Sequence, residues 1–313
     1  MNATIGHYAY ASIEPQEDPI VQFASSDQNE IAQYESAAKL SADGRLDLLK
    51  HVHNYVVHHF NDGHPLSLRL TTRVDVPTGS GLGGSSTLVV AVLKAYAEWL
   101  SYPIDDYELA QSAHRIERHD AGLQGGRQDQ YAAAFGGFNF MEFGQNGGVL
   151  VNPLRIKENV VSELEASLLL FYTGASRFSA TIINEQSKNV QNGNLDAIEA
   201  MHQVKKEAFQ MKEALLRGDF CLLYEVLRGS WDSKRRMASQ IVNEKIEDLY
   251  ETALSAGAHC ARISGAGGGG FMMFLADPMR RKKVADALQQ SEDQGIVYGC
   301  HFTHDGARAW KVM

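Results

Sequence analysis

The chain has 313 residues, of which 44% are hydrophobic and 21% charged, and its formal net charge is −9. This length supports one large domain or two packed domains, and the composition is ordinary for a globular protein. The negative balance disfavours nucleic acid and anionic membranes as partners, although it is compatible with a local phosphate site built from backbone amides.

The spacing of the cysteines and the length of the apolar runs argue against disulfide-rich, zinc-binding and membrane-spanning proteins. Three widely spaced cysteines, Cys221, Cys260 and Cys300, fit neither a disulfide framework nor a zinc pattern. No apolar run approaches the roughly 20 residues that a membrane helix needs. The N-terminus lacks a basic region followed by an apolar one, so no signal peptide is expected. We therefore expect a cytoplasmic protein without a membrane partner.

Hydrophobic periodicity predicts a mixture of strands and helices in the first half of the chain. Alternation predicts a strand over residues 4–13, and the polar stretch 25–36 predicts a loop. Asp43 is the expected N-cap of a helix that ends near Phe60. The later elements of this half are a strand over 66–76, helices over about 85–100 and from Asp105 or Asp106 to Ala121, and a hairpin over 138–143 and 148–152.

The second half is predicted to hold long helices and a few buried strands. Its expected elements are strands at 168–172, 261–263, 271–275 and near Val297 and Ala309, and helices at 179–190, 195–216, 219–237, 244–256 and 278–290. Strands and helices do not alternate strictly, so the fold class is α+β rather than a parallel βαβ sheet. The character of the sequence changes near residue 155, which predicts two domains, 1–155 and 156–313.

A glycine-rich turn after the strand at 66–76 is a candidate phosphate site. It reads Pro77-Thr78-Gly79-Ser80-Gly81-Leu82-Gly83-Gly84-Ser85-Ser86 and leads into an apolar helix. Glycines let the backbone approach an anion closely, and the free amides of a first helical turn point at it with the helix dipole behind them.

Two familiar nucleotide motifs do not fit this turn. Gly79, Gly81 and Gly84 match the dinucleotide fingerprint formally, but a second helix follows instead of a second strand that ends in an acidic residue. A P-loop needs a lysine before its serine or threonine, and the residues here are Ser85 and Ser86. A glycine-rich turn that only packs is the structural alternative.

The string Pro-x-Gly-x-Gly-Leu-Gly-Gly-Ser-Ser resembles the ATP-binding motif of the GHMP kinases. A second string, Ile263-Ser264-Gly265-Ala266-Gly267-Gly268-Gly269-Gly270-Phe271, resembles the C-terminal glycine motif of the same family. The resemblance implies a two-domain fold with the active site in the cleft between the domains, and ATP as the phosphate donor. The implied nucleotide contacts are Pro77, Gly79, Gly81, Leu82, Gly83, Gly84, Ser85, Ser86, Gly265, Gly267 and Gly268.

Two acidic residues, Glu117 and Asp129, extend the resemblance. In the family, a glutamate at about this distance before an aspartate is a magnesium ligand, and the aspartate is the base. Mg²⁺ takes hard oxygen ligands and keeps waters, so a carboxylate, a serine hydroxyl and phosphate oxygens suffice. A hydroxyl nucleophile needs an acceptor for its proton. The structural alternatives are a loop-capping Asp129 and a Glu117 on a solvated helix face.

Ser85 aligns best with the metal-binding serine of the family, and Ser86 is a close rival. Arg127 lies beside the predicted base in the segment Gly125-Gly126-Arg127-Gln128-Asp129-Gln130. We expect Arg127 either to hold Asp129 ionised or to contact the substrate.

Three strings closely resemble the D-glycero-D-manno-heptose 7-phosphate kinases within the family: Asn2-Ala3-Thr4-Ile5, residues 125–139, and Phe171-Tyr172-Thr173-Gly174 with Ser176-Arg177. The resemblance implies phosphorylation of the anomeric hydroxyl of heptose 7-phosphate to the 1,7-bisphosphate, for nucleotide-heptose and surface polysaccharide synthesis. Ser176 and Arg177 are the expected clamp for the phosphate that the sugar already carries, because arginine forks around phosphate oxygens.

The resemblance leaves two other functions open. The chain resembles fucokinase domains less closely, so another sugar 1-kinase is the alternative enzyme, and a non-catalytic nucleotide- or sugar-binding relative is the alternative outside enzymes. We expect a monomer or a homodimer. Members of the family also carry a strand and a glycine-rich turn before the Asn-Ala-Thr-Ile string, which here starts at residue 2, so we expect this first motif to be missing by truncation.

Overall fold

In the computed structural model, which describes residues 1–174 and 179–312, the chain forms two compact units. Unit 1 contains Met1–Gly6, Thr78–Leu82 and Phe138–Phe302, and unit 2 contains His7–Pro77, Gly83–Gly137 and the tail from Thr303. The chain therefore passes several times between the units, and the first glycine-rich turn contributes residues to both. The two-domain division at residue 155 stays a prediction.

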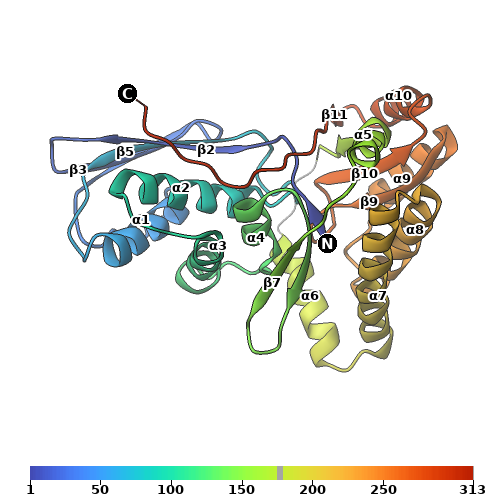
Figure 1. The fold of residues 1–313 in the computed structure, drawn as a ribbon, viewed down its shortest axis with the longest axis horizontal. Coiled ribbons are helices and arrows are strands. Elements are labelled where there is room, and N and C mark those ends of the chain that lie inside the picture. The colour runs from blue at the N-terminus through green and yellow to red at the C-terminus, as the bar shows by residue number, and fades with distance from the viewer. Residues whose placement is uncertain (175–178, 313) are drawn as a thin grey trace. The chain divides into compact units, whose positions relative to one another are not determined.

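Unit 2 consists of one sheet and the helices beside it, which are, in chain order, β2 (Ala9–Pro15), β3 (Ile20–Ser25), β4 (Glu30–Glu35), α1 (Asp47–Phe60), β5 (Leu68–Val74), α2 (Gly84–Leu100), α3 (Asp106–Arg115), the π-helix η1 (Ile116–Asp120) and α4 (Gln128–Phe135). The strand order is β2-β5-β3-β4, with β3 parallel to β5 and the other pairs antiparallel. Helices α1 and α2 lie along one face of this sheet (Figure 1).

Two predicted segments of unit 2 differ from the structure. The strand predicted over 4–13 starts later, because β2 begins only at Ala9 and Ile5 forms only an isolated bridge, with Phe302. The loop predicted over 25–36 contains β4, an edge strand in which Ala32 is buried while Ile31 and Gln33 are exposed. An edge strand with one solvated face needs few apolar residues, which is why its sequence is polar.

Helix α1 does not begin at Asp43, contrary to the prediction. Its N-cap position is Leu46, which has a φ of 48° and makes no side-chain capping bond. Asp43 instead accepts a hydrogen bond from the backbone N–H of Arg45 (2.9 Å) and forms an ion pair with Lys50. The amino group of Lys50, which is 1% exposed, also lies 2.9 Å from a carboxylate oxygen of Asp47. These carboxylates give a buried charge its partners.

The helices predicted after the glycine turn are confirmed, with one change of type. Helix α2 begins at Gly84, and Asp105 caps α3 by accepting a hydrogen bond from the N–H of Glu108 (2.9 Å). The helix expected to continue to Ala121 passes into η1 after Arg115, and the N–H of Ala121 bonds the carbonyl of Ile116 (2.8 Å). Such π-type segments are rare and often lie at functional sites.

Unit 1 holds two sheets and six helices in the part that the structure describes: β1 (Asn2–Ala3), β6 (Phe138–Phe143), β7 (Val149–Pro153), α5 (Glu158–Ser167), β8 (Leu168–Tyr172), α6 (Ser179–Gln191), α7 (Leu195–Arg217), α8 (Phe220–Met237), α9 (Glu244–Ala256), β9 (Ala258–Ile263), β10 (Phe271–Ala276), α10 (Arg281–Ser291) and β11 (Ile296–Tyr298). The predicted hairpin, β6 with β7, is confirmed, as are the four long helices.

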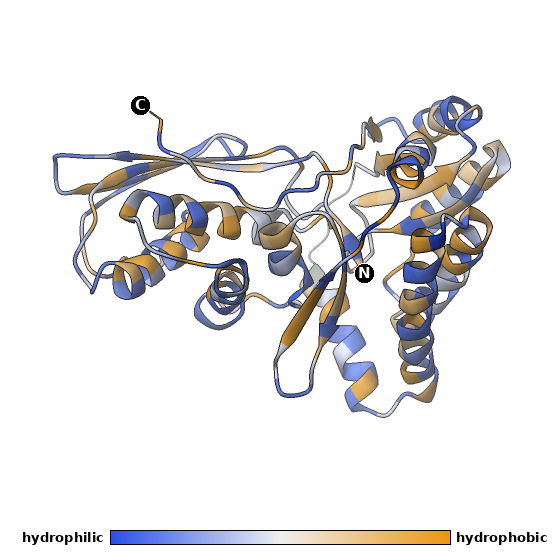
Figure 2. Ribbon diagram, in the orientation of Figure 1, coloured by the Kyte–Doolittle hydropathy of each residue, from blue (hydrophilic) through white to orange (hydrophobic). Residues whose placement is uncertain are grey.

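The core of unit 1 lies against an antiparallel sheet of strand order β11-β8-β10-β9. Central strands β8 and β10 are hydrophobic along their lengths, as Figure 2 shows for β10. Their fully buried residues, among them Phe171, Met272 and Phe274, pack with residues of α8, α9 and α10 in one apolar cluster. Continuous apolar strands are expected where both faces of a sheet are covered.

The tail carries the one predicted strand of the second half that is wrong. Residues 303–312 have no strand, and Ala309 has no sheet pairing. Within unit 2 this tail is held through the N–H of Ala307, which bonds the carbonyl of Ala134 (3.3 Å). Helices and antiparallel sheets mixed in this way confirm the α+β class. Among the described helices, none is both long enough and apolar enough to span a bilayer.

Candidate functional site

Glu117, the predicted magnesium ligand, lies on the π-helix η1 in unit 2 and is fully buried. The carboxylate is not left without partners: Oε1 accepts a hydrogen bond from the hydroxyl of Ser85 (3.0 Å), and Oε2 accepts one from the side-chain amide of Gln130. Burial of a carboxylate is costly unless donors of this kind replace water. The solvated-face alternative for Glu117 is therefore wrong.

The first turn of α2 separates the two rival serines. Ser85 is exposed and donates to Glu117, whereas Ser86 is 1% exposed and accepts a hydrogen bond from Gln130 Nε2 (3.0 Å). Two hard oxygens, Ser85 Oγ and Glu117 Oε1, thus lie side by side at a helix N-terminus. This donor set suits Mg²⁺, which fills its remaining positions with waters and phosphate oxygens. In the described residues no group of three His, Cys, Asp or Glu side chains converges as a metal site.

Gln130 is a site residue that the sequence did not single out. Its side chain is fully buried on α4 and bridges Ser86 and Glu117 through one amide nitrogen, which leaves its Oε1 unpartnered. The donor group must face the carboxylate, so this contact fixes the orientation of the amide. The only sequence signal for it was its position directly after the predicted base.

Asp129, the predicted base, is in the first turn of α4 and packs against the N-terminus of α2. A Cβ atom on Gly83, the N-cap residue of α2, would lie 3.0 Å from Cβ and Cγ of Asp129, so only glycine leaves room for this carboxyl group. Burial, and next the negative charge of Glu117, raise the pKa of Asp129 above its usual range, while Arg118 opposes the shift. A raised pKa of this kind suits a group that accepts and releases a proton.

A cation that acts on Asp129 is Arg118, which lowers the pKa of its carboxyl group. The guanidinium of Arg118 donates to the carbonyls of Gln124 (3.3 Å) and Gly126 (3.3 Å), and a Cβ on Gly125 would lie 2.6 Å from its Cζ. Arg118 therefore supports the loop that leads to Asp129. Arg127, at the N-cap of α4, acts with Arg118 to lower the pKa of His114, after the larger effect of burial.

The two glycine-rich loops contact each other within unit 1. The N–H of Phe271 bonds the carbonyl of Ser80 (2.9 Å), and the N–H of Ser264 bonds the carbonyl of Phe271 (2.8 Å). A Cβ on Gly265 would lie 2.9 Å from the backbone of Gly81, and one on Gly270 would lie 2.3 Å from the carbonyl oxygen of Ser80. The glycine-rich turn therefore packs against the second loop as well as leading into α2, and its role as a phosphate site stays a prediction.

Most of the other predicted nucleotide contacts belong to these loops. Gly79 and Gly81 have φ values of 73° and 82°, and Gly267 and Gly268 have values of 107° and 79°, a conformation that favours glycine. Pro77 and Leu82 are partly buried beside them, and Gly84 is the first residue of α2. Ser176 and Arg177, the predicted clamp for the sugar's phosphate, lie outside the described residues.

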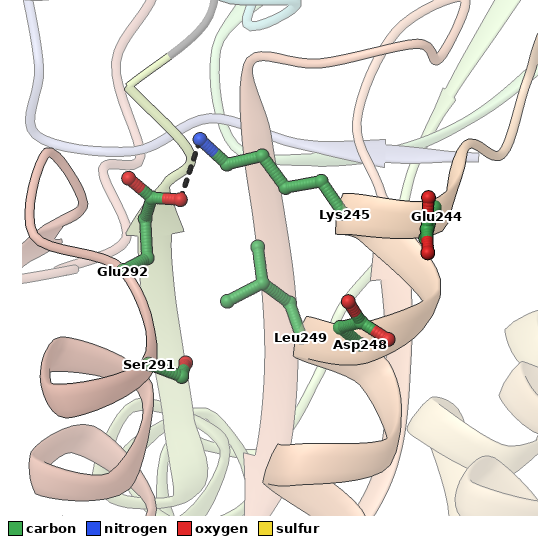
Figure 3. A pocket seen from close by; sticks show the side chains of 6 residues that line it. All are labelled: Glu244, Lys245, Asp248, Leu249, Ser291 and Glu292. Carbon is green, nitrogen blue, oxygen red and sulfur yellow. Dashed lines mark ion pairs between the residues drawn. The ribbon is translucent and has the colours of Figure 1, made fainter.

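A surface pocket of about 270 Å³ lies elsewhere in unit 1, between α9 and α10 (Figure 3). Figure 3 shows Lys245 and Glu292 reaching toward each other across it, and their ion pair measures 2.6 Å. The other charged groups that line it, Glu244 and Asp248, are acidic. This charge disfavours a nucleotide's phosphates, and none of the predicted site residues lines the pocket.

Family models match both parts of the chain. Residues 47–137 match the GHMP kinases N terminal domain, and residues 211–294 match the GHMP kinases C terminal domain. The chain belongs to the GHMP kinase family, whose members transfer phosphate to small molecules.

Two relatives within the family differ in how similar they are to this chain. A protein of Campylobacter jejuni described as D-glycero-alpha-D-manno-heptose 7-phosphate kinase is 46% identical over 312 residues, which cover 100% of this chain and 91% of that protein. A bifunctional fucokinase/GDP-fucose pyrophosphorylase of Arabidopsis thaliana is 28% identical over 71% of this chain. The heptose kinase is thus the far more similar of these two relatives.

Two solved structures of sugar kinases are also similar to this chain over nearly its whole length. A crystal structure described as a D-glycero-D-manno-heptose 1-phosphate kinase from Bacteroides thetaiotaomicron has a TM-score of 0.83 and 40% identity, and covers 99% of this chain and 89% of that one. A putative sugar kinase from Campylobacter jejuni has a TM-score of 0.83 and 45% identity over the same shares. Lactococcus lactis galactokinase, at 18% identity and a TM-score of 0.74, shares the fold.

The raised pKa of Asp129 predicts a stability gain on its removal. Above the ordinary aspartate pKa of about 3.9, the unfolded chain ionises more readily than the folded one, so the charged carboxylate opposes folding. Asp129→Asn should therefore raise the melting temperature at pH 7 in the absence of nucleotide, and the gain should shrink as the pH falls toward 4. Asp105→Asn, which keeps a capping side chain, is the matched control. A lower melting temperature for Asp129→Asn at pH 7 would contradict this account.

The contact between the loops predicts a steric effect at Gly270. Gly270→Ala places a methyl group 2.3 Å from the Ser80 carbonyl at a φ of 86°, so the loops must separate. The control is Gly193→Ala, which has a φ of 70° but nothing within 4 Å of the added methyl group. We expect Gly270→Ala to cost about 1–3 kcal/mol more unfolding free energy than the control in denaturant titrations. Equal losses would show that only backbone strain matters.

Proposed function

We propose that this chain is an ATP- and Mg²⁺-dependent sugar kinase that phosphorylates the anomeric hydroxyl of D-glycero-D-manno-heptose 7-phosphate, giving the 1,7-bisphosphate. The observation that carries the proposal is the 46% identity over the whole chain to a protein described as a heptose 7-phosphate kinase. The arrangement of Ser85, Glu117 and Asp129 supports it, because each has the chemistry that phosphoryl transfer requires.

The metal is held, in this proposal, by Ser85 and Glu117. Their oxygens are 3.0 Å apart at the N-terminus of α2, where helix amides favour anions. Bound Mg²⁺ would neutralise charge on the phosphate oxygens of ATP. Gln130 holds Glu117 in place from its other side, so the carboxylate keeps one oxygen directed at Ser85.

The proton of the attacking hydroxyl passes, in this proposal, to a carboxylate oxygen of Asp129. Its pKa is raised by burial and by Glu117, which makes the carboxylate a better acceptor than an ordinary aspartate. Arg118 opposes this rise and fixes the loop before Asp129, which supports an oriented carboxyl group. Arg127 stays a candidate for contact with the substrate.

The phosphates of ATP are held, in this proposal, by backbone amides of the two glycine loops and of the first turn of α2. Charge does not argue against this, because amide sites depend on geometry and not on the net charge of −9. Ser176 and Arg177 remain the proposed clamp for the sugar's own phosphate. We place the enzyme in the cytoplasm, as a monomer or homodimer, for nucleotide-heptose synthesis.

A second candidate differs in the acceptor. The similar Bacteroides thetaiotaomicron structure is described as a heptose 1-phosphate kinase, so heptose 1-phosphate must be tested as well as the 7-phosphate. Phosphorus NMR with Mg²⁺ and ATP separates the two acceptors, with fucose in parallel. We expect a new anomeric phosphate signal from heptose 7-phosphate. Transfer only to heptose 1-phosphate or to fucose would replace the proposed acceptor, and transfer to none would favour a non-catalytic relative.

The two serines should respond differently to truncation. Ser85→Ala removes a proposed metal ligand and should raise the Mg²⁺ concentration for half-maximal activity by about tenfold or more. Ser86→Ala is the matched control: it removes only the hydrogen bond from Gln130, at about 1 kcal/mol of stability, and should leave the Mg²⁺ requirement unchanged. Activity titrated with Mg²⁺ at saturating ATP measures both. The reverse ranking would make Ser86 the metal ligand.

A further inference from the structure

Lys234 is a buried cation in unit 1 that has no carboxylate partner among the described residues. It lies in the last turn of α8 and is 8% exposed. Its amino group donates instead to two backbone carbonyls, those of Ile263 (3.1 Å) and Gly265 (2.6 Å). Buried lysines are rare without an ionic partner, so these two contacts need an explanation.

Both carbonyls belong to the start of the second glycine loop, and the other half of that loop is also held. The N–H of Gly268 bonds the carbonyl of Ile241 (2.8 Å), and the side-chain amide of Asn243 donates to the carbonyl of Gly268 (3.3 Å). Ile241 and Asn243 lie in the segment between α8 and α9. The loop is therefore held at its start by Lys234 of α8, and at Gly268 by the segment that follows α8.

The contact at Gly265 has a directional consequence. In a trans peptide the N–H points opposite to the C=O, so fixing the Gly265 carbonyl on Lys234 directs the N–H of Ala266 away from it. This N–H has no partner in the described part of the chain. A cation on the carbonyl also polarises the peptide, which strengthens the N–H as a donor. Lys234 thus presents one outward donor beside the first glycine loop, which Gly265 touches at Gly81.

We propose that Lys234 is a positioning residue for nucleotide binding: it orients the Gly265–Ala266 peptide so that the Ala266 N–H binds a phosphate of ATP beyond the α-phosphate. This inference rests on the proposed function for the identity of the ligand, but not on the sugar acceptor. Burial, and then the charge of Arg262, lower the pKa of Lys234 to about 7. A phosphate bound beside the loop would stabilise the ammonium form against both effects.

The test compares two nucleotides on two variants. Lys234→Met keeps the length of the side chain but removes its charge and its donors. Arg235→Met is the matched control, because Arg235 is the next residue of α8 and pairs with Glu247 rather than with the loop. Calorimetry measures the affinity of each variant for Mg²⁺ with the ATP analogue AMPPNP, and for AMP, whose single phosphate lies next to the ribose.

We expect Lys234→Met to weaken AMPPNP at least tenfold while the affinity for AMP changes less than threefold, and Arg235→Met to change neither more than twofold. Equal losses for AMPPNP and AMP, or no loss, would overturn the proposal, since a residue that only stabilises the fold does not distinguish the two. Wild-type protein that binds no AMPPNP would overturn both this inference and the proposed function. Binding without transfer to any sugar would overturn the proposed function alone.

If Lys234→Met does not fold, hydrogen exchange on the wild-type chain tests the same proposal without a variant. AMPPNP, but not AMP, should slow exchange of the Ala266 amide, because only the longer phosphate chain reaches it in this account. Unchanged exchange at Ala266 with AMPPNP bound would overturn the proposal.

Discussion

The backbone contact between the two glycine loops is the constraint on which the proposed phosphate site of unit 1 depends. Side chains at Gly81, Gly265 and Gly270 would collide with the facing backbone, so the contact exists only because these positions carry none. Loops of this kind leave amide groups free, and free amides are what an anion needs where the net charge of the chain is negative. Lys234 holds the start of the second loop by donating to the carbonyls of Ile263 and Gly265.

The second part of the site is organised by one buried carboxylate. Glu117 accepts hydrogen bonds from Ser85 and Gln130 and raises the pKa of Asp129 by its charge. A single group on the π-helix therefore joins the proposed metal ligand Ser85 to the proposed base Asp129. Burying Glu117 and crowding Asp129 cost stability, and costs of this kind are common where a site is shaped for function.

Much of the fold follows from local sequence signals, whereas several site contacts do not. Long amphipathic helices and apolar strands were predictable because their periodicity is strong. The edge strand within 25–36 and the cap at Asp43 were mispredicted, since edge strands read as polar and Asp43 serves Lys50 instead. Gln130 and Lys234 could not be identified from sequence, because an amide or a lysine gains its role only from partners distant in the chain.

The central claim is that Ser85 and Glu117 bind the metal while the glycine loops bind the phosphates of ATP. A crystal structure with Mg²⁺ and AMPPNP tests this most directly. The account predicts Mg²⁺ coordinated by Ser85 Oγ and a Glu117 oxygen, with phosphate oxygens accepting hydrogen bonds from loop amides that include Ala266. Phosphates bound away from both loops, or a metal ion that does not contact Glu117, would contradict it.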